Sequence, residues 1–276
     1  MKKRLLFLDL DGTLLNDAKE ITAGNRAALE RTLEREHGVI ITTGRPLNSA
    51  LEQARRLGLD KPGCYVIAYN GAMVYDWGKG GTVFSRALTI PSVIRVFEKA
   101  KELGEHIQTY DSFHVLVEAQ GDDGAVRRYC KMVSMTHRVI DDVHTDLKED
   151  PVKCLVINYE KKDGLLQMQQ WIRDNMPEMD CFFSCEWFLE VVPKGMNKGE
   201  AVKMLCALQG VEIENAVAAG DAANDLAMLK AAGIGVAMCN GTDEVKAVAD
   251  FITTRDNNHD GVAEIADRFF YEAAEV

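Results

Sequence analysis

The chain has 276 residues, with an apolar share of 47% and a charged share of 27%, a composition typical of a globular protein and not of a disordered one. Its formal net charge of −11 argues against nucleic acid and anionic lipid surfaces as partners, because a negative field repels both. The same field repels a phosphorylated substrate, so a phosphate site in this chain needs local positive charge, such as a bound metal ion.

The sequence carries no sign of a membrane or secreted protein. No stretch approaches the roughly 20 apolar residues of a membrane helix, and the basic N-terminus meets Asp9 too soon for a signal peptide. The seven cysteines form no CxxC pair and no zinc-ligand set, so we expect small buried thiols in a reducing compartment. We expect a cytoplasmic protein, and the sequence does not predict its oligomeric state.

The first 70 residues alternate between strand and helix patterns. Apolar runs predict buried strands at 5–8, 38–42 and 65–68, and capping and Pro signals predict helices at 21–36 and 46–57. Such an alternation predicts right-handed βαβ units and a parallel sheet.

The pattern then changes and later returns. A Gly-rich turn predicts a hairpin of 73–75 with 82–84, and the segment from about 91 to 192 has an α+β pattern of its own. In that segment we expect a helix from about 91, strands near 107–110 and 113–118, a helix near 124–134, a strand at 152–159, a helix at 165–175, and strands near 181–184 and 188–192. The alternation resumes with a helix at 197–209, strands at 216–219 and 234–238, and helices at 222–232, 243–249 and 261–270. The sequence therefore predicts a split core, 1–85 and 193–276, with 86–192 as an inserted domain.

Two carboxylates, Asp9 and Asp11, directly follow the first predicted strand. Residues i and i+2 of an extended chain face the same side, and open parallel sheets bind ligands at the carboxyl ends of their strands. Two carboxylates so close together repel each other unless a cation lies between them. The alternative is an ordinary acidic turn, since Asp and Gly are common turn residues.

A second acidic group, Asp221 with Asp225, follows the strand at 216–219 and opens a helix. Either residue alone could be a helix cap or a first-turn acid. Two acid clusters at the ends of two core strands favour a hard cation with oxygen ligands.

Two further segments suit a phosphate. Thr43 and Gly44 end the second strand, where a hydroxyl group and a helix N-terminus can hold phosphoryl oxygens; a helix-capping turn explains them equally well. Lys198 begins a helix, a position that the helix dipole disfavours for a cation. We therefore interpret Lys198 as a positive charge that binds phosphate.

In this order the segments resemble the haloacid dehalogenase-like phosphohydrolases, in particular their Cof-like branch. The matching segments are 9–14, 43–45, 198–199 and 220–225, with further similarity at 70–72 and 257–262. The segment 238–241 departs from the pattern, because it reads Met-Cys-Asn-Gly where the branch usually has Gly-Asn-Ala. The resemblance implies a Rossmann-like parallel sheet core with helices on both faces, plus an inserted α+β cap domain.

The resemblance also implies a mechanism. It makes Asp9 the nucleophile that forms an aspartyl-phosphate and Asp11 the general acid and base. It makes Thr43, Gly44, Lys198 and Asn224 the phosphate-binding residues, and it implies Mg²⁺ held by Asp9, the main-chain carbonyl of Asp11, Asp221 and Asp225. Residues at which we expect substrate specificity are Arg45, Asn70, Glu186 and Trp187.

These observations predict a Mg²⁺-dependent phosphatase that hydrolyses small phosphorylated metabolites, a phosphoric monoester hydrolase. A phosphomutase of the same superfamily stays open, because it uses the same aspartyl-phosphate. A non-catalytic phospho-ligand-binding protein is a third class, and turnover of a generic phosphate monoester separates it from the enzymes. A phospho-acceptor signalling module is disfavoured by the insertion of roughly 100 residues. The sequence does not reveal the substrate.

Overall fold

The computed structural model describes residues 2–271. The chain divides into two compact units. The first comprises Met1–Gly44, Ala50–Val83 and Asn197–Val276, and the second comprises Arg45–Ser49 and Phe84–Met196. The second unit is therefore an insertion into the sequence of the first, with a short additional piece from the start of the second helix.

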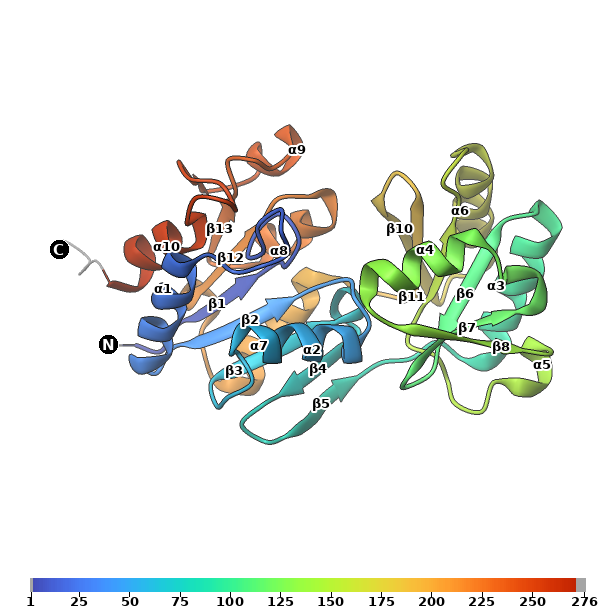
Figure 1. Cartoon of the computed structure of the whole chain (residues 1–276), viewed down its shortest axis with the longest axis horizontal. Coiled ribbons are helices and arrows are strands. Elements are labelled where there is room, and N and C mark those ends of the chain that lie inside the picture. Colours follow the sequence, from blue (N-terminus) through green and yellow to red (C-terminus); the bar gives the residue numbers. More distant parts are fainter. Residues whose placement is uncertain (1, 272–276) are drawn as a thin grey trace. The chain divides into compact units, whose positions relative to one another are not determined.

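An eight-stranded sheet forms the centre of the first unit, in the order β14-β13-β12-β1-β2-β3-β4-β5 (Figure 1). The strands from β14 to β3 pair in parallel, and β4 joins β3 antiparallel. The predicted parallel α/β core is confirmed. The strand bounds are β1 Leu5–Leu8, β2 Gly38–Thr42, β3 Cys64–Ala68, β4 Met73–Asp76, β5 Gly81–Ser85, β12 Ala216–Gly220, β13 Ile234–Ala237 and β14 Phe251–Ile252.

Strand β1 lies in the middle of this sheet, paired with β2 on one side and β12 on the other. All four of its side chains, Leu5–Leu8, are fully buried. A parallel strand that is covered on both faces has no polar face, which is why this strand appears in the sequence as a continuous apolar run. The central position of β1 brings the residues that follow it to the middle of the carboxyl edge of the sheet.

Helices cover the sheet of the first unit, and α1 packs against α10 while α7 packs against α8. The helix bounds are α1 Ala23–Glu34, α2 Leu47–Leu57, α7 Lys198–Gln209, α8 Leu226–Ala231, α9 Asp243–Lys246 and α10 Gly261–Ala266. Thr22 caps α1, and Asn197 caps α7 by accepting a hydrogen bond from the backbone N–H of Glu200 at 3.0 Å. The Asn197 cap fixes where Lys198 begins its helix.

One predicted helix, 222–232, is broken in the structure. A 3₁₀ turn, Ala223–Asp225, precedes α8. The cause is the Asp225 carboxylate, whose Oδ2 accepts hydrogen bonds from the backbone N–H groups of Asp221 and Ala222, at 3.0 and 3.1 Å. These bonds close a tight turn ahead of the helix and leave Asp225 fully buried.

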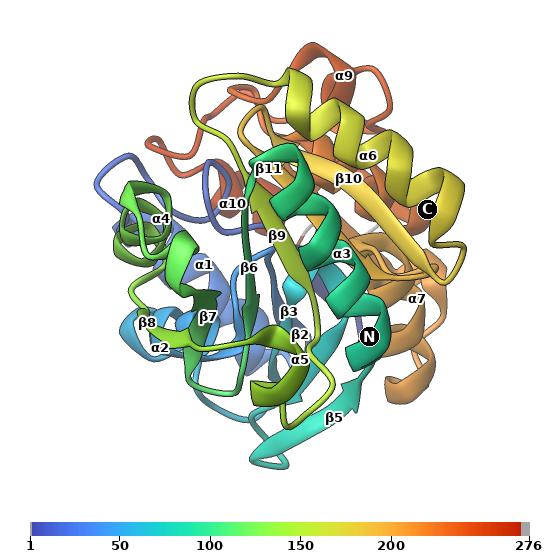
Figure 2. The ribbon, with the colours of Figure 1, turned by 90° about the vertical axis from the view of Figure 1, so that its right-hand side faces the viewer.

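The second unit is a six-stranded sheet in the order β10-β11-β9-β6-β7-β8. Helices α3 and α6 pack side by side on one face of it around a shared apolar core (Figure 2). The predicted inserted α+β layer is thus observed. The bounds are α3 Ile90–Leu103, β6 His106–Tyr110, β7 His114–Glu118, α4 Gly124–Val133, β8 Thr136–Ile140, α5 Val143–Asp146, β9 Cys154–Ile157, α6 Asp163–Asn175, β10 Met179–Cys185 and β11 Phe188–Pro193.

Strand β8, at the edge of this sheet, was not predicted from the sequence. Three of its five residues, Thr136, Arg138 and Val139, are exposed, and Ile140 alone is buried. An edge strand with so few buried side chains lacks the apolar pattern that signals a strand. Within residues 2–271, no helix combines the length and apolar character needed to cross a membrane.

Candidate active site

Asp9 lies directly after β1, where its backbone N–H donates to the carbonyl oxygen of Ala219 at 3.0 Å. This bond continues the pairing of β1 with β12 by one residue, so the Asp9 side chain leaves from the carboxyl edge of the sheet. Only 7% of the residue is exposed. A carboxylate this deeply buried requires partners, because an unpaired buried charge is costly.

The main partner is Lys198, the first residue of α7. Its Nζ lies 2.5 Å from Asp9 Oδ1 and 2.5 Å from Asp225 Oδ1. The side chains of Lys198 and Asp225 are both fully buried. An ammonium group has three N–H donors, so two are used here and one is left for a further acceptor.

Asp221 completes an acidic cluster. One carboxylate oxygen from each of Asp9, Asp221 and Asp225 lies within 4.8 Å of the other two, so the three can hold a metal ion. The Thr13 hydroxyl donates to Asp221 Oδ1 at 2.8 Å. Gly12 approaches so closely that a Cβ there would lie 2.5 Å from Asp221 Oδ2, and its φ of +88° also favours glycine. The two acidic segments, 9–13 and 221–225, are therefore packed against each other.

The cluster shifts the pKa values of its members. Burial raises the pKa of Asp9 well above its usual range; Lys198 opposes this rise, and the neighbouring Asp225 and Asp221 add to it. Burial and the Asp225 carboxylate raise the pKa of Asp221 to about 6. Burial alone would lower the pKa of Lys198, but Asp225 and Asp9 outweigh that effect and raise it. A cation at this site therefore relieves a repulsion that the fold itself creates.

Asp11 points elsewhere. Its side chain is 39% exposed, and Oδ1 accepts a hydrogen bond from Lys19 Nζ at 2.8 Å. Its carboxylate is not part of the cluster formed by Asp9, Asp221 and Asp225. The loop after β1 thus separates the two aspartates: Asp9 faces the buried cluster, and Asp11 lies at the surface.

Thr43, Gly44 and Asn70 lie together in the first unit. Thr43 donates its backbone N–H to Ile67 and accepts from the backbone N–H of Asn70, at 2.9 and 3.0 Å. A Cβ on Gly44 would lie 2.9 Å from Asn70 Oδ1. Asn70 is buried with φ +55°, and neither end of its amide has a partner within residues 2–271. Asn70 therefore offers two polar atoms without a protein partner beside Thr43 and Gly44.

The segment 238–241, where the sequence departs from the family pattern, forms a closed turn. The backbone N–H of Gly241 donates to the carbonyl of Met238 at 2.8 Å. This turn directs Asn240 Nδ2 to the carbonyl of Gly12 at 2.8 Å, and Thr242 donates its N–H to the carbonyl of Asp221 at 2.9 Å. The segment 238–241 and the adjoining Thr242 therefore hold both acidic segments in place by hydrogen bonds to their backbones. This role of Asn240 was not predicted from the sequence.

The remaining predicted site residues are not members of the cluster of Asp9, Asp221 and Asp225. Asn224 is half-buried in the 3₁₀ turn that contains Asp225. Arg45 groups with the second unit. Glu186 and Trp187 form the turn between β10 and β11, also in the second unit; Glu186 is exposed, and the Trp187 ring lies 6.5 Å from that of Tyr159.

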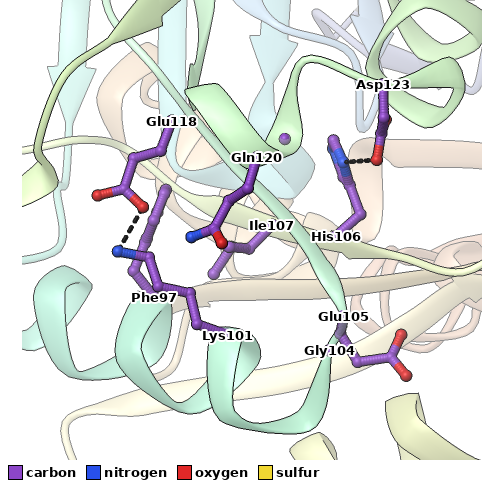
Figure 3. A pocket seen from close by; sticks show the side chains of 10 residues that line it. Phe97, Lys101, Gly104, Glu105, His106, Ile107, Glu118, Gln120 and Asp123 are labelled. Carbon is purple, nitrogen blue, oxygen red and sulfur yellow. Dashed lines mark hydrogen bonds and ion pairs between the residues drawn. The ribbon is translucent and has the colours of Figure 1, made fainter.

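The second unit has a cavity of about 160 Å³ lined by the end of α3, the start of β6 and residues 118–123 (Figure 3). Two pairs of polar side chains lie in this lining. Lys101 pairs with Glu118, and His106 Nδ1 lies 3.1 Å from Asp123 Oδ2. With the further carboxylate of Glu105 in its lining, this cavity is too acidic to attract a phosphoryl group.

The fold and the site together define a class. The chain belongs to the haloacid dehalogenase-like hydrolase family, whose sequence pattern matches residues 6–265. A solved structure of a haloacid dehalogenase-like hydrolase from Bacteroides thetaiotaomicron superposes with a TM-score of 0.87 at 33% identity, covering 98% of this chain and 100% of that one.

Proteins similar to this chain are named phosphatases. The 5-amino-6-(5-phospho-D-ribitylamino)uracil phosphatase YitU of Bacillus subtilis (strain 168) is 30% identical, over 98% of each chain. The pyridoxal phosphate phosphatase YbhA of Escherichia coli (strain K12) is 30% identical, over 96% of this chain and 97% of its own. The protein is a phosphoric monoester hydrolase.

Proposed function

We propose that this protein is a Mg²⁺-dependent phosphatase that hydrolyses small phosphorylated metabolites through an aspartyl-phosphate on Asp9. The observation that carries the proposal is the buried Asp9 carboxylate, with Lys198 Nζ 2.5 Å from one of its oxygens and Asp221 within reach of a shared cation. Phosphoryl transfer requires a nucleophile, a fixed positive charge and a set of metal ligands, and these meet at Asp9.

Asp9 attacks phosphorus with a carboxylate oxygen, and the bond from phosphorus to the leaving oxygen breaks. We assign the binding of the transferring oxygens to Lys198, Thr43, Gly44 and Asn224. The remaining N–H donor of Lys198 supports its role, because it is free to reach a phosphoryl oxygen while the other two stay on carboxylates.

Asp9, Asp221 and the main-chain carbonyl of Asp11 would hold the Mg²⁺ ion. When bound, the ion supplies positive charge that brings an anionic phosphate to a cluster of carboxylates. We assign Asp225 an indirect role, because Lys198 occupies its Oδ1 and two backbone N–H groups occupy its Oδ2. It orients Lys198 and the Asp221 turn.

Asp11 protonates the leaving alkoxide and then removes a proton from the water that cleaves the aspartyl-phosphate. Its position two residues after Asp9 and its solvent-accessible side chain support this role. The proton given up in the first step leaves a carboxylate, and that carboxylate accepts the proton of the water in the second step, so the acid is restored.

We propose that the predicted segments 1–85 and 193–276 carry the chemistry and that the cap, 86–192, selects the substrate together with Arg45 and Asn70. The turn at Glu186 and Trp187 is the candidate selecting loop, because aromatic side chains gather beside it: Phe188 contacts Tyr159 with ring centroids 5.7 Å apart. Flat aromatic surfaces suit a ring-bearing phosphomonoester, and two of the relatives are named for pyridoxal phosphate and for an aminouracil phosphate.

The test is hydrolysis of para-nitrophenyl phosphate, followed by a screen of phosphorylated metabolites ranked by kcat/KM. We expect turnover with Mg²⁺, none in excess EDTA after metal removal is verified, and none for Asp9→Asn. The exposed Asp60→Asn serves as the matched control, because it removes the same charge from the surface. Full activity of Asp9→Asn, with deamidation excluded by mass spectrometry, would refute the assignment of the nucleophile.

A further inference from the structure

A second cavity lies entirely within the first unit, beside the loop that follows β1. It has a volume of about 220 Å³ and is lined by that loop, by α1 and by α2. About 10–15 Å³ suffices for one water molecule, so this space admits a ligand of several atoms. None of its lining residues belongs to the cluster of Asp9, Asp221 and Asp225.

The lining of this cavity is basic in a chain whose net charge is −11. The lining contains three cationic side chains, those of Lys19, Arg26 and Arg56, and one carboxylate, that of Glu20. Lys19 also pairs with Asp11, which compensates part of its charge. The guanidinium groups of Arg26 and Arg56 therefore supply most of the positive potential in the cavity. A concave surface with an excess of cations concentrates anions.

The two arginines differ in how they are held. The Nη1 group of Arg26 donates a hydrogen bond to the carbonyl oxygen of Leu57, the last residue of α2, at 2.6 Å. That bond fixes the guanidinium and leaves its other donors available. Arg56 is exposed. A guanidinium group presents its donors in a fork that matches the oxygens of phosphate or carboxylate.

Gln53 supplies an independent observation. Only 4% of this residue is exposed, it lines the cavity, and its Oε1 atom has no hydrogen-bond partner within residues 2–271. A buried polar atom without a partner costs stability, so its presence here requires a reason. Rotation of the amide by 180° exchanges Oε1 with the Nε2 donor, so the side chain can meet either a hydroxyl or an anionic oxygen of a ligand.

We propose that this cavity is a binding site for a small oxyanion, phosphate or carboxylate, held by Arg26, Arg56, Lys19 and Gln53. It differs in chemistry from the proposed catalytic site, since it offers guanidinium and amide donors and no acidic cluster for a metal. Because Lys19 contacts both the cavity and Asp11, the bound anion lies next to the loop that carries the catalytic aspartates.

The test is calorimetric titration of the full-length protein with inorganic phosphate in excess EDTA at constant ionic strength, with malonate as the carboxylate arm. Arg56→Ala is the test variant. Arg55→Ala is its matched control: Arg55 is the preceding residue of the same helix, is also exposed and has the same charge, and its guanidinium lies over the Trp77 ring at 5.2 Å instead of lining the cavity.

We expect saturable binding by the wild type and by Arg55→Ala, and about 10-fold weaker binding by Arg56→Ala, since a charge-assisted hydrogen bond is lost. Gln53→Leu, which preserves volume, should weaken binding as well. Equal affinity of the two arginine variants, or no saturable binding of either anion, would overturn the proposal. The titration detects binding and not turnover, so it gives an answer whether or not the proposed hydrolysis is found.

Discussion

Replacing Asp221 by asparagine tests the electrostatics of the acidic cluster directly. The pKa of Asp221 rises from 3.8 to about 6 on folding, mainly because the carboxyl group is buried and faces Asp225. The folded protein therefore holds this proton more tightly than the unfolded chain. The stability that Asp221 contributes is fully present below pH 3.8 and is lost as the pH rises through about 6.

The magnitude follows from the same change in pKa. At about 1.36 kcal/mol per pKa unit, ionised Asp221 costs the metal-free folded protein roughly 3 kcal/mol. Part of this cost is the repulsion between Asp221 and the carboxylates of Asp225 and Asp9, and such coupled contributions are not additive. We therefore expect Asp221→Asn to be about 1–3 kcal/mol more stable than the wild type at pH 8. The Thr13 hydrogen bond can be kept by the asparagine oxygen.

The assay is urea unfolding in EDTA at pH 4, 6 and 8, with Asp60→Asn as the control for removing a surface charge. The advantage of Asp221→Asn should be smallest at pH 4 and largest at pH 8. Addition of Mg²⁺ should reduce this advantage, because a ligand at 100 times its Kd stabilises the wild type by about 2.7 kcal/mol and the variant lacks one ligand. If Asp221→Asn is less stable than the wild type at pH 8 in EDTA, the cluster is not repulsive and the reasoning fails.

Three further changes test other parts of the site. Asp11→Asn should raise the ratio of aryl-phosphate to sugar-phosphate turnover by about 100-fold, because an aryl leaving group needs no proton; an unchanged ratio would exclude Asp11 as the acid. Lys198→Met should lower the free energy of unfolding by about 3–5 kcal/mol, since two buried carboxylates lose their partner, whereas Lys203→Met on the exposed side of α7 should have little effect; equal effects of the two variants in denaturant titrations would contradict this. Trp187→Ala should change the ranking of metabolites more than the rate with para-nitrophenyl phosphate, and Phe113→Ala, at an exposed ring of the second unit, should change neither; a uniform loss across substrates would show that the cap does not select.

Periodicity and residue type allowed much of the fold to be predicted. The continuous apolar run of β1 predicts a strand buried on both faces, and alternating strands and helices predict a parallel sheet, because these patterns reflect local geometry and burial. The rule that parallel strands end at one edge also brings Asp9 and Asp221 together without knowledge of any contact.

What only the tertiary structure decided is which side chains pair. Lys198 is 189 residues from Asp9, and its place between Asp9 and Asp225 depends on how α7 packs beside the sheet. The division of labour between a buried Asp9 and a surface Asp11 paired with Lys19 is equally invisible in the sequence, where the two aspartates look alike. Local patterns report the burial that a segment requires, whereas charge pairing and pKa values depend on atoms that distant segments bring within a few ångströms of each other, and the chain alone does not specify those distances.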